Sequence, residues 1–258
     1  MQETSNIYRA LLAQSAAVEK RLVVGDRGVL INKRGDAITV GGVRILVASS
    51  GPESGYDERI VATIETSGQV FAGEGPGVGG TQAGEIDVTM YPTAAKLPRQ
   101  ARLAPYIRLT DGDQTSEWIP QGVYYLDTRE EENPDGLTKL KIHGYDGMLR
   151  AELDYPESRI DWPAADTDVV KEIADAMDVG VDSRVWQIMD GGYRLPYPAG
   201  YSCREVLGYI GSMYAGNWIM SDRGSLLLVP LGGLPKETRL LVDEKRNYIT
   251  VGGVRIRV

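Results

Sequence analysis

The chain has 258 residues and a formal net charge of −8, from 28 basic and 36 acidic side chains. One cysteine and one histidine exclude an intrachain disulfide and zinc sites of the Cys₂His₂, Cys₄ or poly-histidine kind. The acidic balance, without any basic run, argues against a nucleic-acid binder. The sequence has no run of 18 apolar residues, so no membrane-spanning helix is predicted.

Residues 1–25 predict an amphipathic N-terminal helix. Ser5 is a suitable N-cap, and apolar residues recur near helical spacing as far as Glu19. The polar start of the chain does not match a secretory signal, so we expect synthesis in a cytoplasm.

Residues 26–160 predict a turn-rich β domain. Short segments with alternating or β-rich patterns recur here, bounded by glycine and proline: Ile38–Ile45, Glu85–Met90, Tyr106–Leu109, Val123–Leu126 and Lys139–His143. Because no helical pattern separates the later segments, we expect an antiparallel sandwich or barrel.

Residues 161–215 predict a small helical or α+β region. The first helix takes its cap from Asp166 or Thr167 and stops at Gly180 in this interpretation.

A second helix opens with a capping box formed by Ser202 and Glu205. Residues 216–258 predict a β segment that completes the first barrel or forms a second one. Its first part, Trp218–Val229, has the pattern of a hairpin. The predicted fold class is therefore mainly β with an α+β insertion and short helices.

One internal repeat crosses these regions. The eight residues ITVGGVRI occur at Ile38–Ile45 and again at Ile249–Ile256. A Gly-Gly pair supplies the positive φ angles of a two-residue hairpin turn, so both copies predict hairpins. Either hairpin chemistry has converged, or two related β-units occupy equivalent places in a pseudo-symmetric fold.

A glycine-rich segment, Gly75–Gly80, satisfies the pattern GxGxxG. A dinucleotide site needs this pattern between a strand and a helix, whereas here it precedes a predicted strand. No lysine of a phosphate-binding loop follows it. We predict a flexible surface loop.

Alternate polar residues at Asp111, Asp113, Thr115 and Glu117 resemble the start of a calcium loop. Such a loop needs glycine at its sixth position and glutamate at its twelfth, and both are missing. A polar hairpin tip is the favoured interpretation.

Cys203 lies in the first turn of a predicted helix, where a thiol could be activated with His143 as base. Nothing in the sequence links the two residues, so a packed cysteine and a structural histidine are favoured.

The acidic run Glu130–Glu132, with Asp127 and Asp135 nearby, could supply paired carboxylates for glycan hydrolysis. The following turn signals favour a solvated loop. We therefore predict no catalytic, cofactor-binding or metal-binding residue, no cofactor and no enzymatic activity.

Three blocks between Ala83 and Pro156 carry a family resemblance: AGEIDVTMYP, LPRQARLAPYIRLTDGDQTSEWIPQGVYYLDTRE and LKIHGYDGMLRAELDYP. A fourth block, YSCREVLGYIGSMYAGNWIMSDRGSLLLVPL, spans Tyr201–Leu231. In this order the blocks resemble the baseplate hub proteins at the base of phage and prophage tail tubes.

The resemblance implies a virion structural protein made in the host bacterial cytoplasm. It implies a homotrimeric ring of paired β-barrel domains that contacts tail tube and tail tip proteins. DNA would pass through the lumen without sequence-specific recognition, and no membrane is involved. Long relatives append a peptidoglycan hydrolase or fibre module; this chain ends at Val258, so lytic activity is not expected.

Two other functions stay open at this stage. A cell-wall hydrolase would require two carboxylates converging in a pocket. A receptor- or carbohydrate-binding tail-tip module would require an exposed aromatic platform, for which Trp118 and Trp186 are candidates. The 14 tyrosines against one phenylalanine favour half-exposed positions and interfaces.

Overall fold

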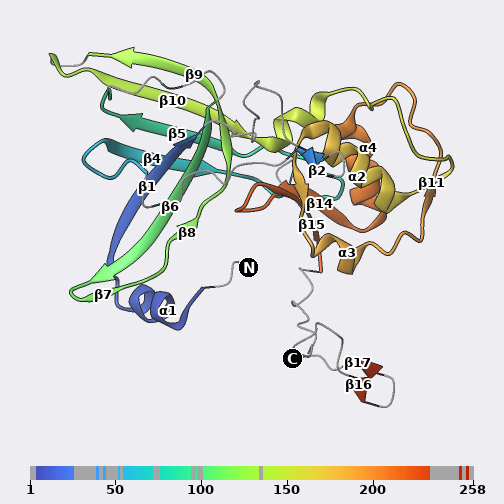
Figure 1. Cartoon of the computed structure of the whole chain (residues 1–258), viewed down its shortest axis with the longest axis horizontal. Helices are drawn as coiled ribbons and strands as arrows, with labels where there is room; N and C mark the ends of the chain where they lie inside the picture. Colours follow the sequence, from blue (N-terminus) through green and yellow to red (C-terminus); the bar gives the residue numbers. More distant parts are fainter. Residues whose placement is uncertain are drawn as a thin grey trace.

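The computed structural model describes residues 4–25, 39–40, 43–44, 52, 55–71, 76–93, 97, 101–133, 136–232, 250–251 and 254–255. These residues are mainly β and form two units side by side, a sheet unit and an α/β unit (Figure 1). Each unit has its own cluster of buried apolar side chains.

The sheet unit is one large antiparallel sheet with the strand order β1-β6-β9-β10-β5-β4. Its strands are β1 (Ala17–Gly25), β4 (Val61–Ser67), β5 (Glu85–Met90), β6 (Arg102–Asp111), β7 (Gln114–Thr115), β8 (Ile119–Pro120), β9 (Tyr124–Glu132) and β10 (Lys139–Asp146). The two short strands β7 and β8 pair with β6. The four segments predicted as strands between residues 85 and 143 are all confirmed.

The core of the sheet unit follows the two-residue period of its strands. In β5, Ile86, Val88 and Met90 are at most 2% exposed, while Asp87 between them is exposed. Leu22 and Leu103, from β1 and β6, are fully buried in the same cluster.

The sheet stays open among the described residues, so the barrel remains a prediction. Among the described residues, the two ends of the strand order are bridged at Leu22 of β1, which pairs with Tyr56, just ahead of β4. Two backbone hydrogen bonds of 2.8 and 2.9 Å make this bridge.

The N-terminal helix is shorter than predicted. α1 spans Asn6–Ala13, and the Ser5 hydroxyl caps it by accepting the N–H of Tyr8 at 3.0 Å. The chain then turns through Ser15, which has a φ of 56°, and continues as β1. The expected extension to Glu19 was wrong because β1 pairs with β6 over nine residues, and this ladder outweighs the local helical spacing.

The α/β unit packs two main helices against a small three-stranded sheet of order β12-β15-β14. Its elements are η3 (Gly147–Glu152), β11 (Ala164–Ala165), α2 (Asp166–Met177), β12 (Gly180–Val181), α3 (Val185–Ile188), β13 (Arg194–Leu195), α4 (Cys203–Met213), β14 (Gly216–Met220) and β15 (Ser225–Pro230). Trp218 is fully buried at its centre, and the indole N–H donates to the carbonyl of Leu207 at 2.8 Å.

The core of the α/β unit includes residues on both sides of the range 161–215. The core of the α/β unit begins at Met148, ahead of residue 161, because η3 packs on α2 and α4. The predicted hairpin within 216–230 is confirmed as β14 and β15, but it packs on α4 in this same core. Residues 233–249 lie outside the described part of the chain.

The helix boundaries test the predicted caps. Ser202 and Glu205 form the expected capping box at the start of α4. Asp166 is the first residue of α2 instead of its cap, and the N-cap, Ala165, makes no side-chain bond. The helix ends at Asp178 with a φ of 55°, because Gly180 is already paired in β12.

Both copies of the repeat form hairpins with the same register. β2 (Thr39–Val40) pairs with β3 (Val43–Arg44), and β16 (Thr250–Val251) pairs with β17 (Val254–Arg255). The Gly-Gly pairs between these strands lie outside the described residues. A symmetry relation between the two copies stays a prediction.

Candidate functional site

The structure keeps Cys203 and His143 in separate environments. Cys203 is fully buried, and burial raises the pKa of its thiol to about 11. The His143 ring lies on β10 and contacts Asp87 of β5 through Nδ1 at 2.9 Å. Neither residue has the other among its contacts, so a nucleophile–base pair is not formed.

The acidic run lies on a strand and not in a loop as predicted. Glu130–Glu132 form the end of β9, opposite the first residues of β10. Glu132 forms an ion pair of 2.8 Å with Lys141 on that neighbouring strand. These exposed carboxylates line no pocket described here, and Asp135 lies outside the described residues.

The alternating polar residues form the β6–β7 hairpin, as expected for a polar tip. Its turn lies between Asp111 and Gln114, where they pair across the strands. The Glu117 carboxylate accepts both the N–H and the hydroxyl of Ser5, and so fastens α1 to the sheet. The described residues contain no cluster of histidine, cysteine or acidic side chains with metal-site geometry.

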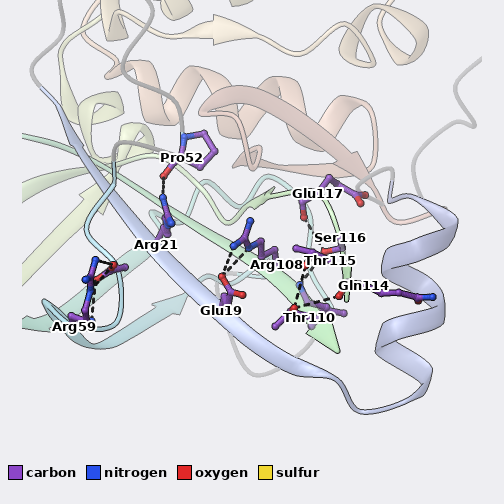
Figure 2. Close-up of polar contacts among 12 residues, drawn as sticks. Glu19, Arg21, Pro52, Arg59, Arg108, Thr110, Gln114, Thr115, Ser116 and Glu117 are labelled. Carbon is purple, nitrogen blue, oxygen red and sulfur yellow. Dashed lines mark hydrogen bonds and ion pairs between the residues drawn. The ribbon is translucent and has the colours of Figure 1, made fainter. Parts of the chain in front are cut away.

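Trp118 does not form an open platform. The guanidinium carbons of Arg108 and Arg21 lie 4.3 and 5.1 Å from the centre of its rings. Figure 2 shows both arginines with their partners: Arg108 binds the Glu19 carboxylate at 2.7 Å, and Arg21 donates to the carbonyl of Pro52. Trp186 is 37% exposed, and Lys171 Nζ lies over its ring, 5.5 Å from the ring centre.

The glycine-rich segment was predicted to be a flexible surface loop, and its described residues contradict this. The N–H of Gly79 donates to the carbonyl of Gly216, and the carbonyl of Gly80 accepts the N–H of Trp218, both at 2.8 Å. The Asn217 side chain accepts the Gly80 N–H at 2.6 Å and donates to the Gly77 carbonyl at 2.8 Å. This segment joins the sheet unit to β14.

A buried carboxylate forms a second contact between the two units. Asp146, the last residue of β10, accepts the N–H groups of Gly84 and Met148 at 2.8 and 2.9 Å. Burial raises the pKa of this carboxyl to about 6, although the two N–H donors act in the opposite direction. Asp146 lines a cavity of about 230 Å³ together with Tyr124, whose pKa burial raises to about 12.

Arg204 adds a third contact from the first turn of α4. Its guanidinium donates to the carbonyl of Thr81 and, at 3.1 Å, to the carbonyl of Met148. It also forms an ion pair of 2.6 Å with Glu152. Asn217, Asp146 and Arg204 therefore fix the sheet unit and the α/β unit relative to each other.

The α/β unit carries an aromatic groove of about 310 Å³. We define the aromatic groove by the residues that line it: Trp162, Val169, Leu195, Pro196, Tyr197, Pro198, Tyr201, Val206, Tyr209 and Ile210. Its volume lies at the lower end of the range for ligand pockets, about 300–1,000 Å³.

Two edge-to-face aromatic pairs line the groove. Trp162 and Tyr197 meet edge to face with centroids 5.4 Å apart, and Tyr201 and Tyr209 do so at 5.6 Å. Tyr197, Tyr201 and Tyr209 are 44%, 42% and 57% exposed. Exposed tyrosines held around an apolar depression are typical of recognition surfaces.

The floor of the aromatic groove belongs to the core of the unit. Val169 of α2 is fully buried, as is Ile210 of α4. The groove is therefore supported by the packing of these two helices.

The sequence signalled tyrosine enrichment but not this location. Trp118 and Trp186 were the expected aromatic platform, whereas the groove uses Trp162 and three tyrosines from the segments around β13 and α4. The pairing of β11 with β13 and the packing of α2 on α4 bring these segments together. No periodic pattern could have identified them.

Comparisons with known proteins give remote similarities. No family model matches the chain, and no curated protein matches it. Among solved structures, the 43 kDa tail protein of prophage MuSo2 from Shewanella oneidensis aligns over 77% of this chain and 68% of its own, with 15% identity and a TM-score of 0.40.

A tail protein from Neisseria meningitidis MC58 aligns over 90% of this chain, with 13% identity and a TM-score of 0.44. The chain spans 58% of that protein's length. With TM-scores below 0.5, neither similarity establishes a shared fold or a shared function. Among the described residues, no helix is long and apolar enough to cross a membrane.

Proposed function

We propose that the chain is a structural protein of a phage or prophage tail, and that it forms a trimeric baseplate hub ring between the tail tube and the tip. Its partners are copies of itself and the tail proteins above and below. In this role the protein is a virion component and carries out no reaction.

The observation that carries the proposal is the position of the hub-like sequence blocks, which form the main elements of both units. Ala83–Pro156 contributes β5, β6, β9 and β10, which form the middle of the large sheet. Tyr201–Leu231 contributes α4, β14 and β15, which form half of the α/β unit. The resemblance thus covers the frame of both units, as expected if it reflects a shared scaffold.

The junction between the units supports a mechanical role. Asn217 is 1% exposed and Asp146 is 9% exposed, and each binds backbone groups of a segment distant in the chain. A subunit of a ring that bears load must hold its parts in a fixed relation. Buried polar contacts of this kind are directional and resist sliding.

The sheet edges support contact between subunits. β4 lies at one end of the strand order, and most of its residues after Val61 are exposed. An edge strand presents backbone groups that a neighbouring chain can pair with.

The duplicated hairpin could supply the two similar surfaces that the proposed hub requires of each subunit. A threefold hub that meets a sixfold tube must present two similar surfaces per subunit. The hairpins β2–β3 and β16–β17, which share one register, are candidates for these surfaces.

The oligomeric mass in solution tests the ring. We expect light scattering after size exclusion to give three times the mass of one chain, at micromolar concentration and without other tail proteins. A monomer, or a dimer, would overturn the trimeric hub.

The place in the virion needs its own test. Gold-labelled antibodies against the chain should bind at the tube end of tailed particles, and labelling of capsids alone would overturn the tail assignment.

A further inference from the structure

We propose that the aromatic groove binds a proline-rich peptide segment in the polyproline II conformation. The inference goes beyond the tail assignment and does not depend on it. It names a peptide site on the α/β unit, formed by Trp162, Tyr197, Tyr201 and Tyr209 over a floor of helix residues.

The composition of the groove fits this ligand. Proline-rich segments bind in grooves lined by tryptophan, tyrosine and proline, because their rings pack flat between aromatic planes. Here two aromatic pairs line the depression: Trp162–Tyr197, with an interplanar angle of 69°, and Tyr201–Tyr209, at 89°. In an edge-to-face pair, the ring that presents its edge keeps both of its faces free of its partner.

The Trp162–Tyr197 pair is held in place before any ligand arrives. The Trp162 indole N–H donates to the Ser158 hydroxyl at 2.9 Å. Tyr155 packs edge to face on both Trp162 and Tyr197, and its own hydroxyl donates to Glu172 at 2.6 Å. A preorganised groove loses little entropy on binding, and a polyproline II segment is itself stiff.

Charge and polarity decide between a proline-rich peptide and a glycan. All ten residues that line the aromatic groove are uncharged, and none is an amide or an aliphatic alcohol. Each ring of a sugar carries several hydroxyls, and the tyrosine hydroxyls are too few to pair with all of them, so their burial there is costly. A proline-rich peptide has no backbone N–H at its proline positions and so lacks this cost.

The tyrosine hydroxyls supply the polar part of recognition. No hydroxyl of Tyr197, Tyr201 or Tyr209 has a hydrogen bond to another described residue, and all three side chains are more than 40% exposed. A polyproline II backbone presents its carbonyl groups outward, unpaired. Tyrosine O–H donors beside apolar ring contacts match that pattern.

The test is a titration of the full chain with acetylated, amidated decaproline, followed by calorimetry and tryptophan fluorescence. A decapeptide of alternating glycine and serine is the control ligand. We expect saturable binding of decaproline alone. Absence of decaproline binding would overturn the proposal.

A matched pair of variants locates the site. Tyr209→Ala removes a groove tyrosine, and we expect about tenfold weaker binding. Tyr193→Ala removes a tyrosine of similar exposure, 45%, that lies outside the groove and forms its own edge-to-face pair with Tyr214. We expect it to bind like the wild type, and equal losses in both variants would place binding elsewhere and overturn the assignment.

Two further measurements keep the result specific. Tyr209→Phe keeps the ring and removes the hydroxyl, so we expect a loss of a few-fold at most. Unchanged urea midpoints for the variants would show that they fold.

The alternative ligand is a glycan, and chitotetraose is its probe. If chitotetraose binds, Tyr209→Ala abolishes that binding and decaproline does not bind, the groove is a glycan site and the proposal is overturned. The oligomeric mass tests the trimeric hub separately, whichever ligand binds.

Discussion

Asn217 accepts a hydrogen bond of 2.6 Å from the backbone N–H of Gly80, although 137 residues separate the two in the chain. The Asn217 side chain is 1% exposed and also binds the Gly77 carbonyl. One buried amide therefore satisfies two backbone groups of a segment that belongs to the other unit, and its bond to the Gly80 N–H is buried from solvent.

Replacing Asn217 by alanine should lower the free energy of unfolding by about 2–3 kcal/mol. The substitution leaves the buried N–H of Gly80 without its acceptor and removes the donor to the Gly77 carbonyl. Urea unfolding followed by circular dichroism measures the loss. Asn133→Ala, at an exposed position, is the control and should change stability by less than about 0.5 kcal/mol. Equal midpoints for both variants would contradict the role given to Asn217.

Gly79→Ala should destabilise the protein by about 2–4 kcal/mol, because strain at positive φ and a steric clash add. Gly79 has a φ of 78°, and a Cβ there would lie 2.6 Å from the carbonyl oxygen of Gly208. Gly77→Ala is the matched control, since a Cβ at Gly77 meets nothing within 4 Å. A thermal melt of each variant checks the difference; two similar melting temperatures would show that the segment tolerates a side chain at both positions.

Ser202→Ala should cost about 1 kcal/mol, because the hydroxyl of Ser202 accepts the N–H of Glu205 in the capping box of α4. Ser202→Thr keeps the acceptor and should lose much less. Guanidinium midpoints of the two variants measure the difference. If the alanine variant is as stable as the threonine variant, the cap contributes nothing measurable.

Asp146 should make stability depend on pH in an unusual direction. Its pKa of about 6 in the fold is above the ordinary value of 3.8, so the folded state holds this proton more tightly than the unfolded state. The carboxyl therefore favours folding below pH 4, and this contribution is lost as the pH rises towards 6, by up to about 3 kcal/mol.

The comparison that isolates this effect is wild type against Asp146→Asn. The difference in unfolding free energy, wild type minus variant, should fall between pH 4 and pH 7 in urea titrations. Parallel pH profiles for the two proteins would mean that the pKa of Asp146 is not raised by burial.

The purified protein should not cleave peptidoglycan. Glu130 and Glu132 are strand residues, and the pockets described here do not include them. Zymography on cell-wall substrate measures the activity. Clearing that disappears when Glu130–Glu132 are replaced by glutamine would establish a hydrolase.

Features that depend on neighbouring residues could be predicted from the sequence. The alternation of Ile86, Val88 and Met90 identified β5, and the spacing of Ser202 and Glu205 identified the start of α4. Both signals are complete within a few residues.

Features that depend on distant partners could not be predicted. β1 replaces the end of the expected helix because its partner β6 begins at Arg102. The glycine-rich segment is ordered by Asn217, and the aromatic groove combines Trp162 with Tyr209. In each case the deciding contact is tertiary and leaves no periodic pattern in the chain.

The contact between Gly80 and Asn217 also sets an order of events during synthesis. All strands of the large sheet have been translated once Asp146 is made, yet the partner of Gly80 leaves the ribosome 137 residues after Gly80 itself. At 5–20 residues per second, this is a delay of roughly 7–27 s. During that interval the nascent sheet unit has an undocked glycine-rich segment, which chaperones and proteases can reach until α4 and β14 emerge.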